Sequence, residues 1–201
     1  ALLPSAGWLS EETTDAPDRL GHDGLGAGLA WLVDRIDGTR DFIHGRPGWA
    51  VSVALVSSGR PLLGMLSAPA QGEFWHGESG QGSWRNGVRL AASQRRELAG
   101  ARVPARIRPA GESDLVSVDQ PNSIALRMAM VAADEADMVA TVRWGYEWDI
   151  GAAALIAREA VLLFVLAHRD HRPVLRRRIA RPVRLQPQQR DLEHEVAAGR
   201  V

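Results

Sequence analysis

The most constraining feature of this sequence is a strand-like apolar run that ends in two carboxylates three residues apart. The run covers residues 29–33, and Asp34 and Asp37 follow it just before Gly38 and Thr39. A buried strand that ends in acids and then turns can present carboxylate oxygens and backbone N–H groups at one place. Hard cations such as Mg²⁺ prefer oxygen ligands, and helix N-terminal N–H groups bind phosphate. The segment therefore predicts metal-assisted phosphate chemistry.

The composition excludes several other kinds of protein. The formal net charge of the 201 residues is zero, so it favours neither nucleic acid nor an anionic membrane as a partner. Cys is absent, which excludes disulfides and thiolate nucleophiles and fits a reducing, cytoplasmic compartment. The longest apolar run, residues 160–167, is too short to cross a bilayer. The first residue is Ala rather than Met, as expected of a fragment.

The hydrophobic pattern predicts strands that alternate with helices. Strands are expected at residues 8–10, 29–33, 50–56, 61–66, 114–118 and 139–144, and residues 161–165 are also strand-like. Glycines and the Asn86-Gly87 pair predict a hairpin within residues 72–87, because Asn-Gly supplies the positive φ of tight turns. Ser123 is expected to cap a helix that runs toward Met138, and a second helix is expected over residues 149–160.

This interleaving predicts an α/β layered sandwich of sheets and helices. We divide the chain into an N-terminal half, residues 1–96, and a C-terminal half, residues 97–201. From about residue 168 the sequence is rich in Arg, Gln and Pro. Such a stretch is expected to be disordered or poorly packed. A shifted reading frame in a GC-rich gene would also produce a sequence of this composition.

Three separated stretches carry acids that can meet at one site. Glu11 and Glu12 follow a short apolar strand, Asp34 and Asp37 end the next one, and Asp149 begins a helix. Most of them have an ordinary alternative, since a Glu pair can be a solvated loop and an Asp at a helix start can be an N-cap. Asp34 is harder to explain that way, because a carboxylate near the core needs a cation or an Arg to balance it.

The order of these motifs resembles the inositol monophosphatase superfamily of Mg²⁺-dependent, lithium-sensitive phosphatases. The motifs are SEE at residues 10–12, DRIDGTRDF at 34–42, GWAVSVALV at 48–56 and EWDIGAAALIAREA at 147–160. The resemblance runs from about residue 7 to residue 160. It implies an αβαβα sandwich of the sugar-phosphatase type that lacks its N-terminal helices ahead of Ala1.

The resemblance also implies a role for each matching residue. Two or three Mg²⁺ ions would be held by Glu11, Asp34, the Ile36 carbonyl, Asp37 and Asp149. Glu11, Asp37 and Thr39 would be the catalytic residues, with Glu11 and the Thr39 hydroxyl preparing the attacking water. Gly38 and Thr39 would offer backbone N–H groups to the phosphate. The implied reaction is hydrolysis of a phosphate monoester by metal-activated water, without a covalent intermediate.

For the substrate, the acidic loop and the helix at residues 122–127 look most similar to 3′(2′),5′-bisphosphate nucleotidases. The expected substrate is then 3′-phosphoadenosine 5′-phosphate, with Ser123, Arg127 and Asp149 as the residues that bind it. Alternatively, Ser123 is only a helix cap and Arg127 only a surface charge. Inositol 1-phosphate is the close alternative substrate, and sugar or histidinol phosphates follow. Family members are often homodimers, so the resemblance also allows a homodimer.

One departure from the family pattern is Arg35, which stands where the family usually has Pro. Without Pro the turn is less fixed, and the guanidinium can pair with Asp34 or Asp37 and compete with the metal, or else point to solvent. We expect weaker Mg²⁺ binding than is usual in the family. Arg35, the missing helices and the Arg-rich end also support a hypothesis of another class, a catalytically inactive remnant.

Overall fold

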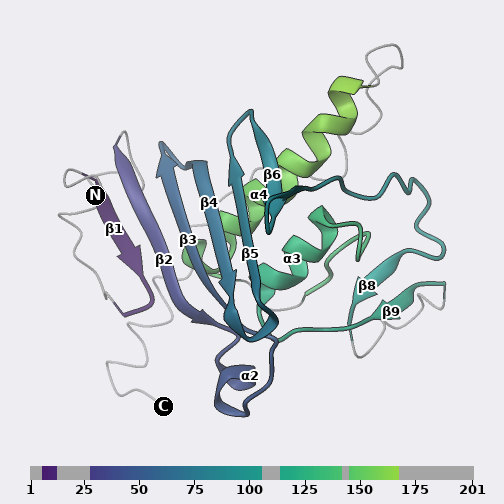
Figure 1. Cartoon of the computed structure of the whole chain (residues 1–201), viewed down its shortest axis with the longest axis horizontal. Coiled ribbons are helices and arrows are strands. Elements are labelled where there is room, and N and C mark those ends of the chain that lie inside the picture. The colour runs from purple at the N-terminus through teal and green to yellow at the C-terminus, as the bar shows by residue number, and fades with distance from the viewer. Residues whose placement is uncertain (1–5, 13–27, 106–113, 142–144, 168–201) are drawn as a thin grey trace, which may run out of the picture. The chain divides into compact units, whose positions relative to one another are not determined.

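A seven-stranded sheet organises the residues that the computed structural model describes, which are 6–12, 28–105, 114–141 and 145–167. The strands follow one another across the sheet in chain order (Figure 1). β1 runs parallel to β2, and all later neighbours are antiparallel. The strands are β1 (Gly7–Ser10), β2 (Leu29–Asp37), β3 (Ala50–Ser57), β4 (Arg60–Ala68), β5 (Glu73–Glu78), β6 (Gly82–Arg85) and β7 (Val88–Arg89).

Two longer helices pack together against the sheet, and they fix the position of the loops at its end. α4 (Glu147–Ala167) contacts strands β2 to β6 and also α3 (Ile124–Ala132), and Figure 1 shows it crossing behind the strands. The approach is close, since a Cβ on Gly64 would lie 2.7 Å from the Ala152 carbonyl oxygen. Two short helices complete the connections, α2 (Thr39–Ile43) after β2 and the 3₁₀ helix η1 (Pro69–Gln71) after β4.

The main core lies between the sheet and these helices. It combines Leu32, Leu66 and Trp75 from the strands with Ala129 from α3 and Ile156 from α4. Apolar residues at alternate strand positions supply this layer, as expected for strands with one face against helices. The mixed α/β architecture is therefore confirmed. The described residues contain no helix ahead of β1.

Most of the predicted elements are present. The predicted strands at residues 8–10, 29–33, 50–56 and 61–66 are confirmed, and β5 and β6 form the hairpin expected within residues 72–87. Ser123 caps α3, because its hydroxyl oxygen accepts a hydrogen bond from the Leu126 N–H at 2.9 Å. The second helix is also confirmed, although it begins at Glu147 and is longer than expected.

Three predictions of secondary structure were wrong. α3 ends at Ala132 instead of continuing toward Met138, because Asp134 takes a positive φ of 60° that a helix cannot continue through. Residues 139–141 are not a strand, and residues 142–144 lie outside the described residues. Residues 161–165 belong to α4, since no Gly or Pro interrupts the helix after Glu159.

A second, two-stranded parallel sheet pairs β8 (Arg102–Pro104) with β9 (Val116–Val118). β9 falls within the strand predicted at residues 114–118, whereas β8 was not predicted, because Arg and Pro dominate its surroundings. Arg102 joins this sheet to the turn after α3: its Nε and Nη2 donate to Asp137 at 3.1 and 2.9 Å, and its side chain also binds Asp134. The Arg102 backbone N–H donates to Asp137 as well, at 2.7 Å.

All described residues lie within one compact unit, residues 1–169. The division into halves at residue 96 stays a prediction. The Arg-rich stretch from residue 168 lies outside the described residues. Within the described part of the chain, no helix combines the length and the apolar character needed to cross a membrane.

The Arg102–Asp137 pair yields the first prediction. These hydrogen bonds hold the pKa of Asp137 well below its usual range, because Arg102 stabilises the charged form. Asp137→Asn should lower the free energy of unfolding at pH 7 by about 2 kcal/mol. A lowered folded pKa contributes stability above the unfolded value of about 3.9 and loses it as the pH falls. Urea unfolding should therefore show a difference that shrinks below about pH 4.

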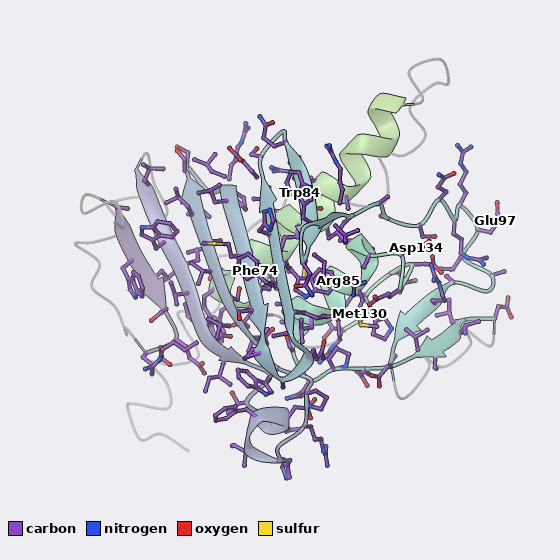
Figure 2. All side chains as sticks on the ribbon, viewed as in Figure 1. Phe74, Trp84, Arg85, Glu97, Met130 and Asp134 are labelled. Atoms are coloured by element: carbon purple, nitrogen blue, oxygen red, sulfur yellow. The ribbon has the colours of Figure 1, made fainter. Side chains whose placement is uncertain are left out.

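The matched control is Glu97→Gln, which neutralises an exposed acid (Figure 2). Its free energy of unfolding should equal that of the parent within about 0.5 kcal/mol. An Asp137→Asn variant as stable as the parent at pH 7 would contradict the assignment of this pair as a clamp.

Candidate active site

A bulge in β2 brings the two motif aspartates to the same side of the sheet. Asp34 pairs with Ser52 of β3 and Asp37 pairs with Ala50, so that the register shifts by one residue between them. In a regular strand, residues three apart point to opposite faces, and one inserted residue reverses that relation. Both residues are buried: Asp34 exposes 3% of its surface to solvent and Asp37 exposes 8%. The bulge is therefore what makes a joint site from this spacing.

Asp34 is a carboxylate in an unfavourable place for a charge. Its pKa is raised to about 7, first by burial and then by the negative charges of Asp37, Asp149 and Glu11. The Ile36 N–H donates to Asp34 Oδ1 at 2.9 Å, which opposes the shift only in part. A cation at this position would stabilise the charged form of Asp34.

Asp149 reaches the same place from the first turn of α4. Its pKa is raised to about 6, first by burial and then by the charges of Asp37 and Glu11. The interaction with the Asp34 side chain acts in the opposite direction and lowers the pKa of Asp149. The Tyr146 N–H also donates to Asp149 Oδ2 at 2.8 Å. Asp34 and Asp149 thus form a direct pair.

Ser52 fixes the start of α4 beside Asp34, and sequence reasoning missed this role. It lies opposite Asp34 in the strand register, is fully buried, and its hydroxyl donates to the Trp148 carbonyl oxygen at 3.1 Å. The sequence shows Ser52 only as the polar member of an alternating strand. Its partner lies 96 residues further along the chain, so only the packing of α4 on β3 reveals it.

Asp37 holds the N-terminus of α3. It accepts hydrogen bonds from the Ala125 and Ile124 N–H groups at 2.7 and 3.3 Å, and from the Ser123 hydroxyl. Burial raises the pKa of Asp37, and these hydrogen bonds act against the rise. An acid at a helix N-terminus satisfies unpaired N–H groups and opposes the positive end of the helix dipole. Asp37 therefore joins the β2 turn to α3.

Ser123 and Arg127, the predicted substrate-binding residues, both have partners within the protein. Ser123 is fully buried and bonded to Asp37 and to the Leu126 N–H, which matches the helix-cap alternative. Arg127 is half-buried and donates to the carbonyl oxygens of Pro121 and Asn122 at 2.8 and 2.7 Å, so it is not a simple surface charge. Burial lowers the pKa of Arg127. Contact of either residue with substrate stays a prediction.

The Gly38-Thr39 turn depends on a close approach that only glycine permits. Gly38 has a φ of 93°, and a Cβ there would lie 2.8 Å from the Ser123 nitrogen and 2.7 Å from the Gly48 carbonyl oxygen. Thr39 begins α2, and its hydroxyl donates to the Ile36 carbonyl oxygen at 3.1 Å. The Ile36 carbonyl keeps a second lone pair, which can serve another partner.

Asp41 is a second residue that the sequence analysis left without a role. It is buried in α2, accepts a hydrogen bond from the Asn122 N–H at 3.0 Å, and lies 3.7 Å from Arg46 Nη1. A Cβ on Gly48 would lie 2.1 Å from Asp41 Oδ2. Its place in an acid-rich motif was the signal in the sequence. Asp41 fastens α2 to the loop ahead of α3.

Glu11 lies just beyond β1 and is exposed. It contributes to the raised pKa values of both Asp34 and Asp149, so its charge lies within range of both. Arg35 pairs with Glu12 (Nη2–Oε1, 2.7 Å). The expected pairing of Arg35 with Asp34 or Asp37 is not the one found, because the bulge leaves Arg35 exposed while both aspartates are buried.

A separate cavity of about 350 Å³ has Asp41 in its lining. Its lining includes Asp41, Arg46, Trp75, Arg85, Met130 and Glu135, and Figure 2 labels Arg85 and Met130 in this region. Arg85 there pairs with Glu135 at 2.6 Å and with Glu73 at 3.3 Å. Glu11, Asp34 and Asp149 do not line it, so it is distinct from the carboxylate site.

Comparison with known proteins places this combination of sheet, bulge and acids in one family. The sequence profile described as "Inositol monophosphatase family" matches residues 1–197. The chain belongs to the inositol monophosphatase family. The resemblance seen in the sequence is thereby confirmed.

Individual relatives agree with this placement. Inositol monophosphatase 2 of Solanum lycopersicum is 30% identical over 173 residues, which are 79% of this chain and 64% of that protein. The Thermotoga maritima fructose-1,6-bisphosphatase/inositol-1-monophosphatase is 34% identical over 138 residues, 65% of this chain and 54% of that one. The inositol monophosphatase structure from Anabaena superposes with a TM-score of 0.66 at 26% identity, covering 79% of this chain and 66% of that one.

This inositol monophosphatase family chain therefore spans between half and two thirds of the length of those relatives. Family members are generally Mg²⁺-dependent. The residues present fit such an ion chemically, because the carboxylates of Asp34 and Asp149 are hard oxygen donors with raised pKa values, and no cationic side chain is among the causes that act on them within the described part of the chain. Among the described residues, no group of three or more Asp, Glu, His or Cys side chains lies close enough together to hold a metal ion without some adjustment.

The strained Asp34 charge gives the second prediction. At pH 8, Asp34→Asn should raise the free energy of unfolding of the metal-free protein by on the order of 2 kcal/mol, because a raised folded pKa makes the charged form costly. The Asn Oδ1 can still accept the Ile36 N–H. Thermal unfolding in EDTA should show this gain, and added Mg²⁺ should stabilise the parent more than the variant. Equal Mg²⁺ effects in both proteins would contradict a metal site at Asp34.

The third prediction concerns Ser52. Ser52→Ala should lower the free energy of unfolding by about 1 kcal/mol and weaken Mg²⁺ binding, because the start of α4 loses its anchor beside Asp34. Urea unfolding and calorimetric Mg²⁺ titration measure the two effects. Ser67→Ala, on β4, is the control and should leave Mg²⁺ binding unchanged. If both variants bind Mg²⁺ like the parent, Ser52 does not position Asp149.

Proposed function

We propose that this chain carries the active site of a Mg²⁺-dependent phosphoric monoester hydrolase that acts on a small phosphorylated metabolite. The observation that supports this most directly is the pairing of buried Asp34 with half-buried Asp149. The Asp149 charge helps to raise the pKa of Asp34 although the two residues lie on elements more than a hundred residues apart, and the charges of Asp37 and Glu11 act on both. Burying unpaired acids together is costly, so the arrangement is best explained by a cation that they hold.

The proposed ligands are those that the sequence predicted: Glu11, Asp34, the Ile36 carbonyl, Asp37 and Asp149. Bound Mg²⁺ would neutralise the phosphate, lower the pKa of a bound water and stabilise the leaving oxygen. Glu11 and the Thr39 hydroxyl would orient that water for in-line attack on phosphorus. Backbone N–H groups of Gly38 and Thr39 would bind the phosphate oxygens, and Asp149 would also contact the substrate.

The protein's own contribution is mainly to keep these groups in place. The bulge sets Asp34 and Asp37, Ser52 sets the start of α4, and Asp37 ties the turn to α3. The chain lacks Cys, and the proposed route uses water directly rather than a covalent enzyme intermediate. Such positioning of reactants can account for much of a rate enhancement.

For the substrate, we favour a phosphorylated polyol such as inositol 1-phosphate. The names of the Solanum and Thermotoga relatives support it. The first expectation, 3′-phosphoadenosine 5′-phosphate, rested on Ser123 and Arg127, whose polar atoms bind Asp37 and loop carbonyls. It remains the second candidate because of the acidic-loop motif. A homodimer and a cytoplasmic location remain predictions from the family resemblance and the composition.

The fourth prediction tests this function. Phosphate release should be measured with Mg²⁺ on inositol 1-phosphate, 3′-phosphoadenosine 5′-phosphate, histidinol phosphate and fructose 1,6-bisphosphate. We expect turnover that EDTA abolishes and lithium inhibits, fastest on inositol 1-phosphate. Asp34→Asn should lower kcat/KM about 100-fold or more, whereas Glu97→Gln should leave it unchanged. Faster turnover of the nucleotide would restore the first expectation, and no turnover of any ester would favour the inactive remnant.

A further inference from the structure

Arg35 and Glu12 connect two segments that both contribute to the proposed metal site. Arg35 lies in the bulge of β2, and Glu12 lies two residues beyond the end of β1. Arg35 Nη2 is 2.7 Å from Glu12 Oε1, and the Ser10 hydroxyl donates to Glu12 Oε2 at 3.4 Å. The register between β1 and β2 ends at Ser10 and Val33. The ion pair thus ties the acidic loop to β2 just beyond the last strand pairing.

The charges around this pair separate the two glutamates. The Arg35 hydrogen bond is the main cause that lowers the pKa of Glu12, so Glu12 takes up the Arg35 charge. Glu11 instead acts on Asp34 and Asp149, whose pKa values it helps to raise. Of these adjacent acids, Glu12 binds the guanidinium directly, whereas Glu11 lies within range of Asp34 and Asp149 and acts on Arg35 only as a weaker, more distant charge.

We propose that Arg35 is a positioning residue, whose ion pair with Glu12 holds Glu11 beside Asp34 and Asp149 for metal binding. This inference rests on the proposed function. The bulge makes it geometrically available, because it leaves the Arg35 side chain 67% exposed while the flanking acids Asp34 and Asp37 are buried. A proline at this position would fix the backbone but would have no side chain to reach Glu12.

The sign of the effect on Mg²⁺ separates this role from simple electrostatics. A positive charge close to a cation site repels the cation, so its removal alone would tighten Mg²⁺ binding. If Arg35 instead holds Glu11 in place, its removal weakens Mg²⁺ binding. The two readings therefore predict changes in opposite directions for the same substitution.

The fifth prediction compares three variants of the full chain by calorimetric titration with Mg²⁺ alone. Arg35→Gln should raise the Mg²⁺ dissociation constant about two- to five-fold, as expected for loss of an exposed ion pair. Arg40→Gln, which neutralises an exposed Arg of α2, is the control and should not raise it. The double variant Arg35→Glu with Glu12→Arg reverses the pair at constant net charge, and it should restore the parent value.

Two further measurements complete the test. Raising the salt concentration should weaken Mg²⁺ binding more in the parent than in Arg35→Gln, because screening weakens the exposed ion pair. In the metal-free protein, amide hydrogen exchange at residues 10–12 should be faster in Arg35→Gln than in the parent. This exchange measurement does not depend on metal binding or on catalysis.

The outcomes separate this inference from the proposed function. Tighter or unchanged Mg²⁺ binding in Arg35→Gln, or no rescue by the reversed pair, overturns the positioning role while the metal site stands. If the parent binds no Mg²⁺, the proposed function fails. Exchange at residues 10–12 then decides whether the ion pair holds the loop: faster exchange in Arg35→Gln supports the tie, and equal exchange overturns it.

Discussion

The one-residue bulge in β2 is the constraint on which the candidate site depends. Without it, the spacing of Asp34 and Asp37 would place one carboxylate against the helices and the other on the opposite face of the sheet. With it, Asp34 meets Asp149 at the start of α4, and Asp37 meets the N-terminus of α3. A bulge interrupts strand pairing and turns the local backbone. Here that irregularity brings acids from separate elements into one electrostatic environment.

Burial and charge then act together on the acids. Asp34 and Asp149 have raised pKa values because burial removes Asp34 almost wholly and Asp149 in part from water, and because other carboxylates lie near them. Asp37 differs from these two acids because it accepts hydrogen bonds from N–H groups of α3, which oppose the rise of its pKa. Among the described residues, the site therefore combines two carboxylates whose pKa is raised with no cationic side chain acting on them and one, Asp37, that accepts hydrogen bonds. Carboxylates with raised pKa values are typical of functional sites, where a protein loses some folding stability in order to bind or react.

The residues that position the acids come from distant parts of the chain. Ser52 of β3 binds Trp148, Asp41 of α2 binds Asn122, and Arg35 of β2 binds Glu12. The neutral Ser52 hydrogen bond and the exposed Arg35 ion pair contribute about 1 kcal/mol each, and a hydrogen bond to a charged carboxylate such as Asp41 contributes about 1.5–3 kcal/mol. Their importance lies in what they hold, because metal and phosphate sites tolerate little displacement of their ligands.

Much of the arrangement could be predicted from local patterns. Alternating apolar residues predicted β3 and β4, the glycines and Asn86-Gly87 predicted a hairpin within residues 72–87, and Ser123 predicted the start of α3. Asn86-Gly87 itself forms the turn between β6 and β7. These features depend on neighbouring residues only. The errors arose where a distant or conformational effect dominated. At Asp134, for example, the left-handed backbone prevents α3 from continuing. The apolar segment at residues 161–165 was wrongly predicted as a strand, because apolar runs of that length occur in both strands and helices.

The sequence by itself determined which acids are available, in what order they follow the strands, and which family they resemble. Only the tertiary structure decided which of them meet and which partners they have. Arg35 pairs with Glu12 rather than with the aspartates beside it, and Ser123 serves Asp37. The physical reason is that strand register, bulge position and helix packing are set by the whole core. A sequence pattern records the spacing of residues along the chain, but not the direction in which each side chain points after folding.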